Sequence, residues 1–179
     1  MRLRRWARPG CAARSCDWPS RPASYHATCP GLPPHPSYIE HLLSQADQQA
    51  REGKIDEALA AYTAAQQLNP HYQVGAEHWN ALCWDGALWG QVKDVLEACG
   101  TAVALAPSDG DYHDSRGLAR PLTGDTTGAV EDFEAFIAWE KQQQEPDTNA
   151  ITQRQQWIAD LKAGRQPFDK ATLEQLREQ

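Results

Sequence analysis

The apolar and polar positions between Glu77 and Pro107 predict two amphipathic helices that are joined at a glycine. Residues that recur every three or four positions lie on one face of a helix. Gly90 interrupts this spacing and Pro107 ends it, because neither residue favours the interior of a helix. The apolar face of the first half is formed by Trp79, Leu82 and Cys83, and that of the second half by Val95, Cys99 and Ala102.

The same register returns on both sides of this stretch. A shift back by 37 residues places Gly90 on Gly53, and a shift forward by 34 residues places it on Gly124. Self-similarity at a fixed period of this length is typical of stacked helical hairpins. The longer first interval fits the connection at 71–75, because loop closure costs little extra entropy when a few residues are added. An ordinary helical bundle with accidental spacing is the alternative.

Small residues occupy the positions where the two helices of a pair must cross. These positions hold Ala46, Cys83 and Gly117 in the first helices and Ala58, Val95 and Ala129 in the second helices. Tyr62 and Phe133 then fill the gap to the next pair, and Cys99 stands at the same place in the central pair. One pair cannot bury its apolar face alone, so the pairs are predicted to stack.

These residues resemble the tetratricopeptide repeat, whose pattern W-x2-L-G-x2-Y, A-x3-F, P begins here at Trp79 and ends at Pro107. The resemblance covers about residues 38–145 and includes bacterial proteins that contain such repeats. It implies an all-α fold, a tetratricopeptide-like array of helical hairpins (an α-solenoid), with repeats at about 39–72, 76–109 and 110–145. Helices within 147–178 are predicted to cap the array, because its last face would otherwise be exposed.

Capping signals mark the expected helix ends. Ser37 with Glu40, and Ser108 with Asp111, have the spacing of a capping box. Pro121 removes a backbone hydrogen bond, so the helix that opens the third pair should kink there or end early. Later helices are expected to start at the N-caps Asp125, Asp147 and Asp169. The expected ranges are about 38–52, 75–89, 92–105, 125–144 and 147–163. A further helix after Gly53 is expected to run to about residue 68, another opens at the Ser108 capping box, and a short one follows residue 169.

Charge is divided unevenly along the 179 residues. The first 37 residues carry six Arg and one Asp, which gives +5, whereas the rest carries 11 basic and 23 acidic residues, which gives −12. Seven of the twelve prolines also lie in this first segment, so residues 1–36 are predicted to be a disordered tail and 37–179 the helical domain. An acidic domain repels nucleic acid and anionic membranes, and neither is an expected partner. Nucleic-acid binding through the Arg-rich tail is one alternative function.

The five cysteines suggest no metal site. Cys83 and Cys99 are predicted to be small core residues with reduced thiols, as in a cytoplasmic protein. A zinc site is the alternative for the tail, but its ligands lack the paired C-x2-C spacing of structural zinc. The residues concerned are Cys11, Cys16 and Cys29 with His26 and His35. We expect no metal.

Sequence motifs for catalysis are absent. The chain has no H-E-x-x-H, no phosphate-binding loop and no G-x-S-x-G. Ser108, Asp109 and His113 lie too close together along one helix start to form a catalytic triad. We therefore expect no enzyme and no cofactor.

Binding is the function that the resemblance implies. In this repeat the first helices of the pairs line a concave groove, where a peptide or helix of another protein is held. An acidic groove with Trp84 at its centre favours a basic partner with an apolar anchor, and Trp84 is assigned either to the groove or to the core. A C-terminal regulatory or oligomerisation module of a larger signalling protein or protease is the other alternative. The expected groove residues are Glu40, Leu43, Asp47, Arg51, Glu77, Asn80, Trp84, Leu88, Asp111, Asp114 and Leu118.

Overall fold

The computed structural model describes residues 36–178, and within them the chain folds into eight α-helices. The predicted tail and its cysteine and histidine residues lie outside the described residues. The helices are α1 (Pro36–Arg51), α2 (Ile55–Leu68), α3 (Ala76–Leu88), α4 (Val92–Leu105), α5 (Gly110–Leu122), α6 (Thr126–Glu140), α7 (Thr148–Lys162) and α8 (Lys170–Arg177).

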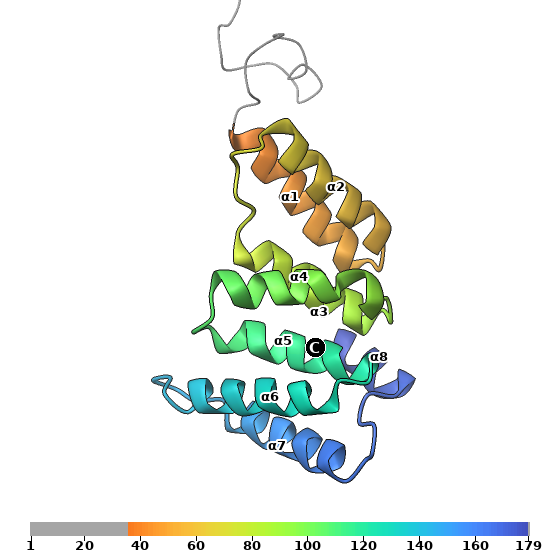
Figure 1. Ribbon diagram of the computed structural model, residues 1–179, viewed down its shortest axis with the longest axis vertical. Helices are drawn as coiled ribbons and strands as arrows, with labels where there is room; N and C mark the ends of the chain where they lie inside the picture. Colours follow the sequence, from red (N-terminus) through yellow and green to blue (C-terminus); the bar gives the residue numbers. More distant parts are fainter. Residues whose placement is uncertain (1–35, 179) are drawn as a thin grey trace, which may run out of the picture.

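Three hairpins stack one above the other (Figure 1). The helices α1 and α2, α3 and α4, and α5 and α6 pack against each other as pairs. The first helices of neighbouring pairs also pack together, α1 on α3 and α3 on α5. We call the surface formed by α1, α3 and α5 the A face. The all-α array of hairpins that the sequence predicts is therefore the fold of the described chain.

The helices of each pair meet at the small residues that the register selects. Ala46, Cys83, Ala58, Val95 and Ala129 are fully buried. A Cβ atom on Gly117 would lie 2.9 Å from the ring of Phe133, which is closer than two carbon atoms can approach. The crossing of α5 and α6 therefore requires a residue without a side chain.

Glycine also makes the turn inside each hairpin. Gly53, Gly90 and Gly124 follow the first helices and have φ values of +78°, +75° and +92°. Side chains disfavour this left-handed conformation, and glycine adopts it freely. The three aligned glycines are the backbone feature that fixes the period of the array.

Several helix ends differ from the expected ones. The first helix begins at Pro36, so Ser37 lies within its first turn. The N-cap of α5 is Asp109 rather than Ser108, and its side chain accepts from the backbone N of Asp111. Helix α6 ends at Glu140, four residues before the predicted end at residue 144. The carboxylate of Glu140 accepts a hydrogen bond from the backbone N of Asp147 at 2.6 Å. This hydrogen bond ties the connection to the start of α7.

The predicted N-caps of the last three helices are confirmed. The side chains of Asp125, Asp147 and Asp169 accept from backbone N atoms in the first turns of α6, α7 and α8. Pro121 lies in the last turn of α5, and the helix ends one residue later at Leu122, so the hydrogen bond that proline removes falls at the end of the helix. The last helix, α8, does not extend the stack of hairpins and packs against α3 instead.

Cys83 and Cys99 form a disulfide, so the expectation of two reduced thiols was wrong. Both residues lie where α3 and α4 are closest, and their Cα atoms are 4.8 Å apart, within the range that a disulfide spans. Their sequence positions already placed them at this crossing. The reason for the error is that small core residues at a crossing and paired cysteines satisfy the same spacing.

Loss of this disulfide should lower stability by about 3 kcal/mol, the entropy of closing a loop of this size in the unfolded chain. A thermal melt with and without a phosphine reductant measures the effect. The Cys83→Ala/Cys99→Ala variant is the control, because its melting temperature should not respond to the reductant. Equal melting of the native chain in both conditions would contradict the assignment.

Candidate functional site

The A face carries most of the residues that the sequence assigns to a groove. Four of them are exposed, namely Glu40, Arg51, Glu77 and Asp111. Three are half-buried, namely Asp47, Asn80 and Trp84. Four are buried and face the interior, namely Leu43, Leu88, Asp114 and Leu118. The A face as folded is therefore more polar than the sequence predicts.

Each buried member has a structural partner. Leu43 belongs to the apolar cluster of the first hairpin, and Leu88 and Leu118 belong to the larger cluster of the remaining helices. Asp114 is held by Arg154 of α7, whose Nε and Nη2 donate at 2.9 and 2.6 Å. These four side chains do not line a groove in this structure, because packing and pairing turn them inward.

Trp84 lies between the two locations that the sequence leaves open. It is half-buried, and it packs against the larger apolar cluster without entering it. One turn earlier, Oδ1 of Asn80 is buried and has no hydrogen-bond partner. The middle of α3 thus presents an aromatic side chain beside an amide whose carbonyl is unsatisfied.

A cluster around Asp47 joins α1, α2 and α3. The hydroxyl of Tyr62 donates to Asp47 Oδ1, and Asp47 Oδ2 lies 2.9 Å from Nδ1 of His78. Tyr62 stacks on Trp79 with ring centroids 5.5 Å apart. The hydrogen bond from the imidazole to Asp47 raises the pKa of His78. The cluster fixes the first hairpin against the second and absorbs most of the hydrogen-bonding capacity of Asp47.

Asp85 is the acidic residue of this region that the sequence analysis did not select. Burial raises its pKa to about 6; Arg51 opposes this shift and Asp47 adds to it. The signal in the sequence is a single aspartate in an otherwise apolar half of a helix, Leu82–Leu88. The burial of Asp85 near Asp47 therefore lowers the stability of the fold when both carboxylates are charged.

A second polar cluster lies between α5 and α6. The carboxylate of Asp132, which is 2% exposed, accepts from Nε and Nη2 of Arg116 at 2.8 and 2.7 Å. Arg120 Nη1 and His113 Nδ1 each lie 2.9 Å from this carboxylate. Arg116 stands 34 residues after Leu82, so a cation replaces the leucine of the repeat pattern. The buried Asp132 is what allows this replacement, because an unpaired buried charge is strongly destabilising.

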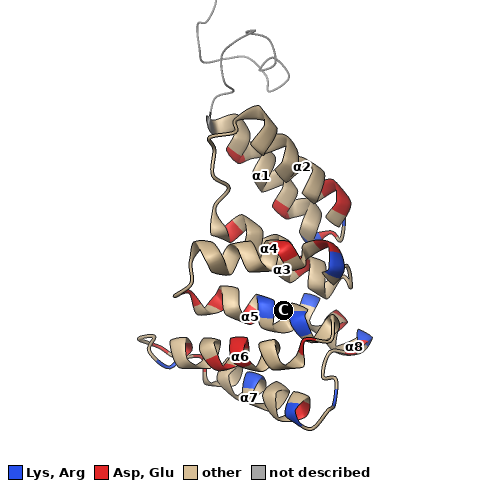
Figure 2. Ribbon diagram, in the orientation of Figure 1, with Lys and Arg blue, Asp and Glu red and all other residues tan. Residues whose placement is uncertain are grey.

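Acidic and basic positions are unevenly distributed along the ribbon (Figure 2). Acidic positions occur on α1, α2 and α6 and at the start of α3 and α5, whereas Lys and Arg positions occur in the last half of α5, on α7 and near α8. The start of the A face therefore attracts cations. Attraction of this kind mainly sets the rate of association and the sign of the partner.

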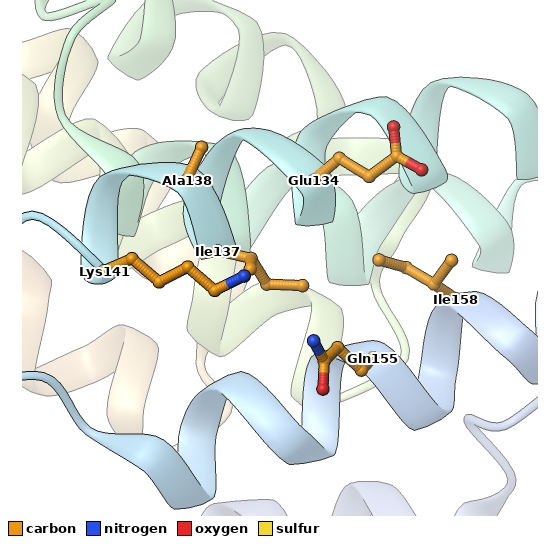
Figure 3. A pocket seen from close by; sticks show the side chains of 6 residues that line it. All are labelled: Glu134, Ile137, Ala138, Lys141, Gln155 and Ile158. Atoms are coloured by element: carbon orange, nitrogen blue, oxygen red, sulfur yellow. The ribbon is translucent and has the colours of Figure 1, made fainter.

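A cavity of about 460 Å³ lies away from the A face, between α6 and α7 (Figure 3). Its floor is formed by Ile137 and Ile158, which point toward each other, and its rim by Glu134, Lys141 and Gln155. None of the residues predicted from the sequence lines it. Within residues 36–178 no group of acidic, histidine or cysteine side chains is arranged to hold a metal ion, and none of the described helices is long and apolar enough to span a bilayer.

Replacing Asp85 with Asn should stabilise the chain at neutral pH by roughly 1–2 kcal/mol, because a pKa of about 6 in place of 3.8 means that the charged form is disfavoured in the fold, and solvent around the partly exposed side chain reduces the effect. The contribution of Asp85 to stability is therefore greatest below pH 4 and declines as the pH rises to about 6. Urea unfolding at pH 4 and pH 7.5 checks this. The gain should be absent at pH 4 and in the exposed control Glu131→Gln; a gain that is equal at both pH values would refute the cause.

Comparison with known proteins bears on the fold. No family model and no curated protein sequence matches this chain. The structure of PcrH from Pseudomonas aeruginosa is similar over 74% of this chain and 96% of its own, with 18% identity and a TM-score of 0.58. The first TPR domain of the human RPAP3 protein is similar over 72% of this chain and 98% of its own, with 22% identity and a TM-score of 0.54.

A third similar structure contains a ligand. It is the first TPR domain of Spaghetti (RPAP3) bound to the HSP90 peptide SRMEEVD, with 22% identity over 72% of this chain and 99% of its own, and a TM-score of 0.52. At these identities the similarity concerns the fold alone. The described chain has the stacked-hairpin fold of tetratricopeptide domains.

Proposed function

We propose that this chain is a protein-interaction scaffold that holds a peptide or helix of another protein on the A face. The observation that carries the proposal is the middle of α3, where the half-buried Trp84 lies beside the unsatisfied Asn80 and close along the helix to Asp85. An aromatic side chain with polar neighbours is typical of the centre of an interface. The proposal assigns binding to this surface and no catalysis.

The sign of the partner follows from the charges of the A face. Glu40, Glu77 and Asp111 are exposed there, and Arg51 is the one basic residue among the predicted groove positions. The peptide SRMEEVD in the similar structure contains three acidic residues. A peptide of that composition is repelled here, so the proposed partner is basic and carries an apolar anchor for Trp84.

Location stays a prediction. The sequence favours the cytoplasm, but disulfides are rare in that compartment and common in oxidising ones. The Cys83–Cys99 disulfide is the feature of the structure that argues against a cytoplasmic site.

Selection of random peptides on the immobilised chain should enrich basic sequences that contain an aromatic or aliphatic anchor. Trp84→Ala should weaken the selected peptides by about 2 kcal/mol or more, as truncation of a central aromatic residue does. Calorimetric titration and thermal melting of the same variant separate binding from folding. The control Trp139→Ala removes a half-buried tryptophan of α6 and should leave affinity unchanged. A stable Trp84→Ala variant with native affinity would disprove the role of Trp84.

Charge reversal on the A face should slow association. Glu77→Lys/Asp111→Lys places two cations at the start of α3 and α5, and the rate constant for binding a selected basic peptide should fall at least tenfold at low salt. Glu97→Lys/Glu131→Lys makes the same change in net charge on α4 and α6. Stopped-flow fluorescence with both variants tests position against total charge, and equal slowing in the two would count against the A face.

A further inference from the structure

The C-terminal helix α8 packs on α3, one of the three helices that form the A face. After α7 the chain turns back, and α8 lies against α3 instead of extending the stack (Figure 1). Leu176 is 6% exposed and belongs to the apolar cluster that also contains Leu88 and Leu118. Leu173 packs against this cluster from the same side of α8. Leu88, which the tetratricopeptide register places in a groove, therefore lies at the end of α3 on which α8 docks.

Arg177 fastens the end of α8 to the end of α3. Its Nη1 donates to the backbone O of Leu88 at 2.8 Å, and its guanidinium carbon lies 4.3 Å from the ring centre of Trp89. The last carbonyls of a helix lack internal partners and carry partial negative charge, so a cation is favoured there. Trp89 in turn donates from Nε1 to the backbone O of Arg51 at 3.1 Å. One arginine thus connects α8 with α3 and, through Trp89, with α1.

The segment before α8 is anchored separately. Phe168 is 3% exposed and lies 4.9 Å from the ring centre of Trp157 and 6.2 Å from that of Phe133. The side-chain amide of Gln166 donates to the backbone O of Pro121 at 2.9 Å. These contacts hold residues 166–168 against the end of α5 and the middle of α6 and α7. Beyond Phe168, the attachment of α8 consists of Leu173, Leu176 and Arg177.

The rest of α8 faces solvent. Lys170, Ala171, Glu174 and Gln175 are exposed. A helix of eight residues does not persist by itself in water, so α8 is helical because it is docked. Its release exposes Leu173, Leu176 and the part of the apolar cluster that they cover, while Phe168 keeps the segment attached nearby. A tethered segment of this kind competes with any free ligand at an effective concentration on the order of millimolar.

We propose that α8 is an internal occupant of the A face, and that the partner is an amphipathic helix of the same chemistry that displaces it. This inference rests on the proposed function. The chemistry is given by the docked residues: two leucines three positions apart, followed directly by an arginine. The acids at the start of α3 and α5 remain uncovered by α8, so further basic residues in the partner would gain contacts that α8 lacks.

A labelled synthetic peptide of residues 165–179 tests competition in the full-length chain. Leu176→Asp should release α8 and tighten binding of the peptide about tenfold, because the tethered competitor is removed. Gln175→Asp adds the same charge to the exposed side of α8 and should leave the affinity at the native value. A peptide that carries the Leu176→Asp change should bind none of the three proteins. Fluorescence anisotropy measures all six combinations of the two peptides with the native chain and the two variants.

Arg177→Ala is the milder variant and leaves the apolar contacts in place. It should tighten the peptide about threefold, the size expected from one cation–π contact and one hydrogen bond at a partly exposed site. Both variants should unfold cooperatively. The midpoint of Arg177→Ala should be close to that of Gln175→Asp, and that of Leu176→Asp lower, because a buried apolar contact is lost. Two results would contradict the proposal and make α8 part of the fixed core. One is that neither variant binds the peptide more tightly than Gln175→Asp does, and the other is that Arg177→Ala loses cooperative unfolding.

The same proteins separate this inference from the proposed function. Peptides selected on the native chain that bind Leu176→Asp and Gln175→Asp equally well would leave the scaffold in place and overturn the competition. Tighter binding of the 165–179 peptide to Leu176→Asp, with no foreign peptide bound by any variant, would support the internal occupant and overturn the scaffold.

Discussion

The whole array depends on how closely two helices approach at their crossing. Gly117 against Phe133 shows the limit, since not even a methyl group fits between α5 and the ring. Gly86 shows it in the central pair, where a Cβ atom would lie 2.5 Å from Val95. Close approach lets the large residues Tyr62 and Phe133 be fully buried. Because interiors are packed to nearly crystalline density, the small residues decide where each hairpin sits on the next.

Polar clusters then take over positions where the repeat pattern expects apolar ones. Arg116 replaces a leucine and is paired with Asp132, and Tyr62 extends its hydroxyl to Asp47. A buried ion pair contributes less stability than an apolar contact of the same size, but removing one partner is costly. These clusters therefore determine which residues must occur together. They also pair acidic side chains, such as Asp47, that the sequence alone would assign to a binding surface.

The fold was predictable from the sequence because its signals are local and repeated. Gly53, Gly90 and Gly124 mark the hairpin turns, and Asp125, Asp147 and Asp169 mark helix starts. The site was predictable only in part. Register alone cannot tell that Asp114 is turned inward by Arg154, since the pair is 40 residues apart in the sequence. Nor can it tell that Cys83 and Cys99 are joined, because a free thiol fits the same crossing.

The C-terminal helix shows which interactions the end of α3 offers to a segment that covers it. The expectation of a basic partner came from acids at the start of the A face, whereas Arg177 of α8 meets the last carbonyl of α3 and the ring of Trp89. Leu173 and Leu176 meet the apolar cluster instead. The end of a helix favours a cation and an apolar cluster favours leucine, so any segment that covers the end of α3 meets the same two conditions, whether it belongs to this chain or to another.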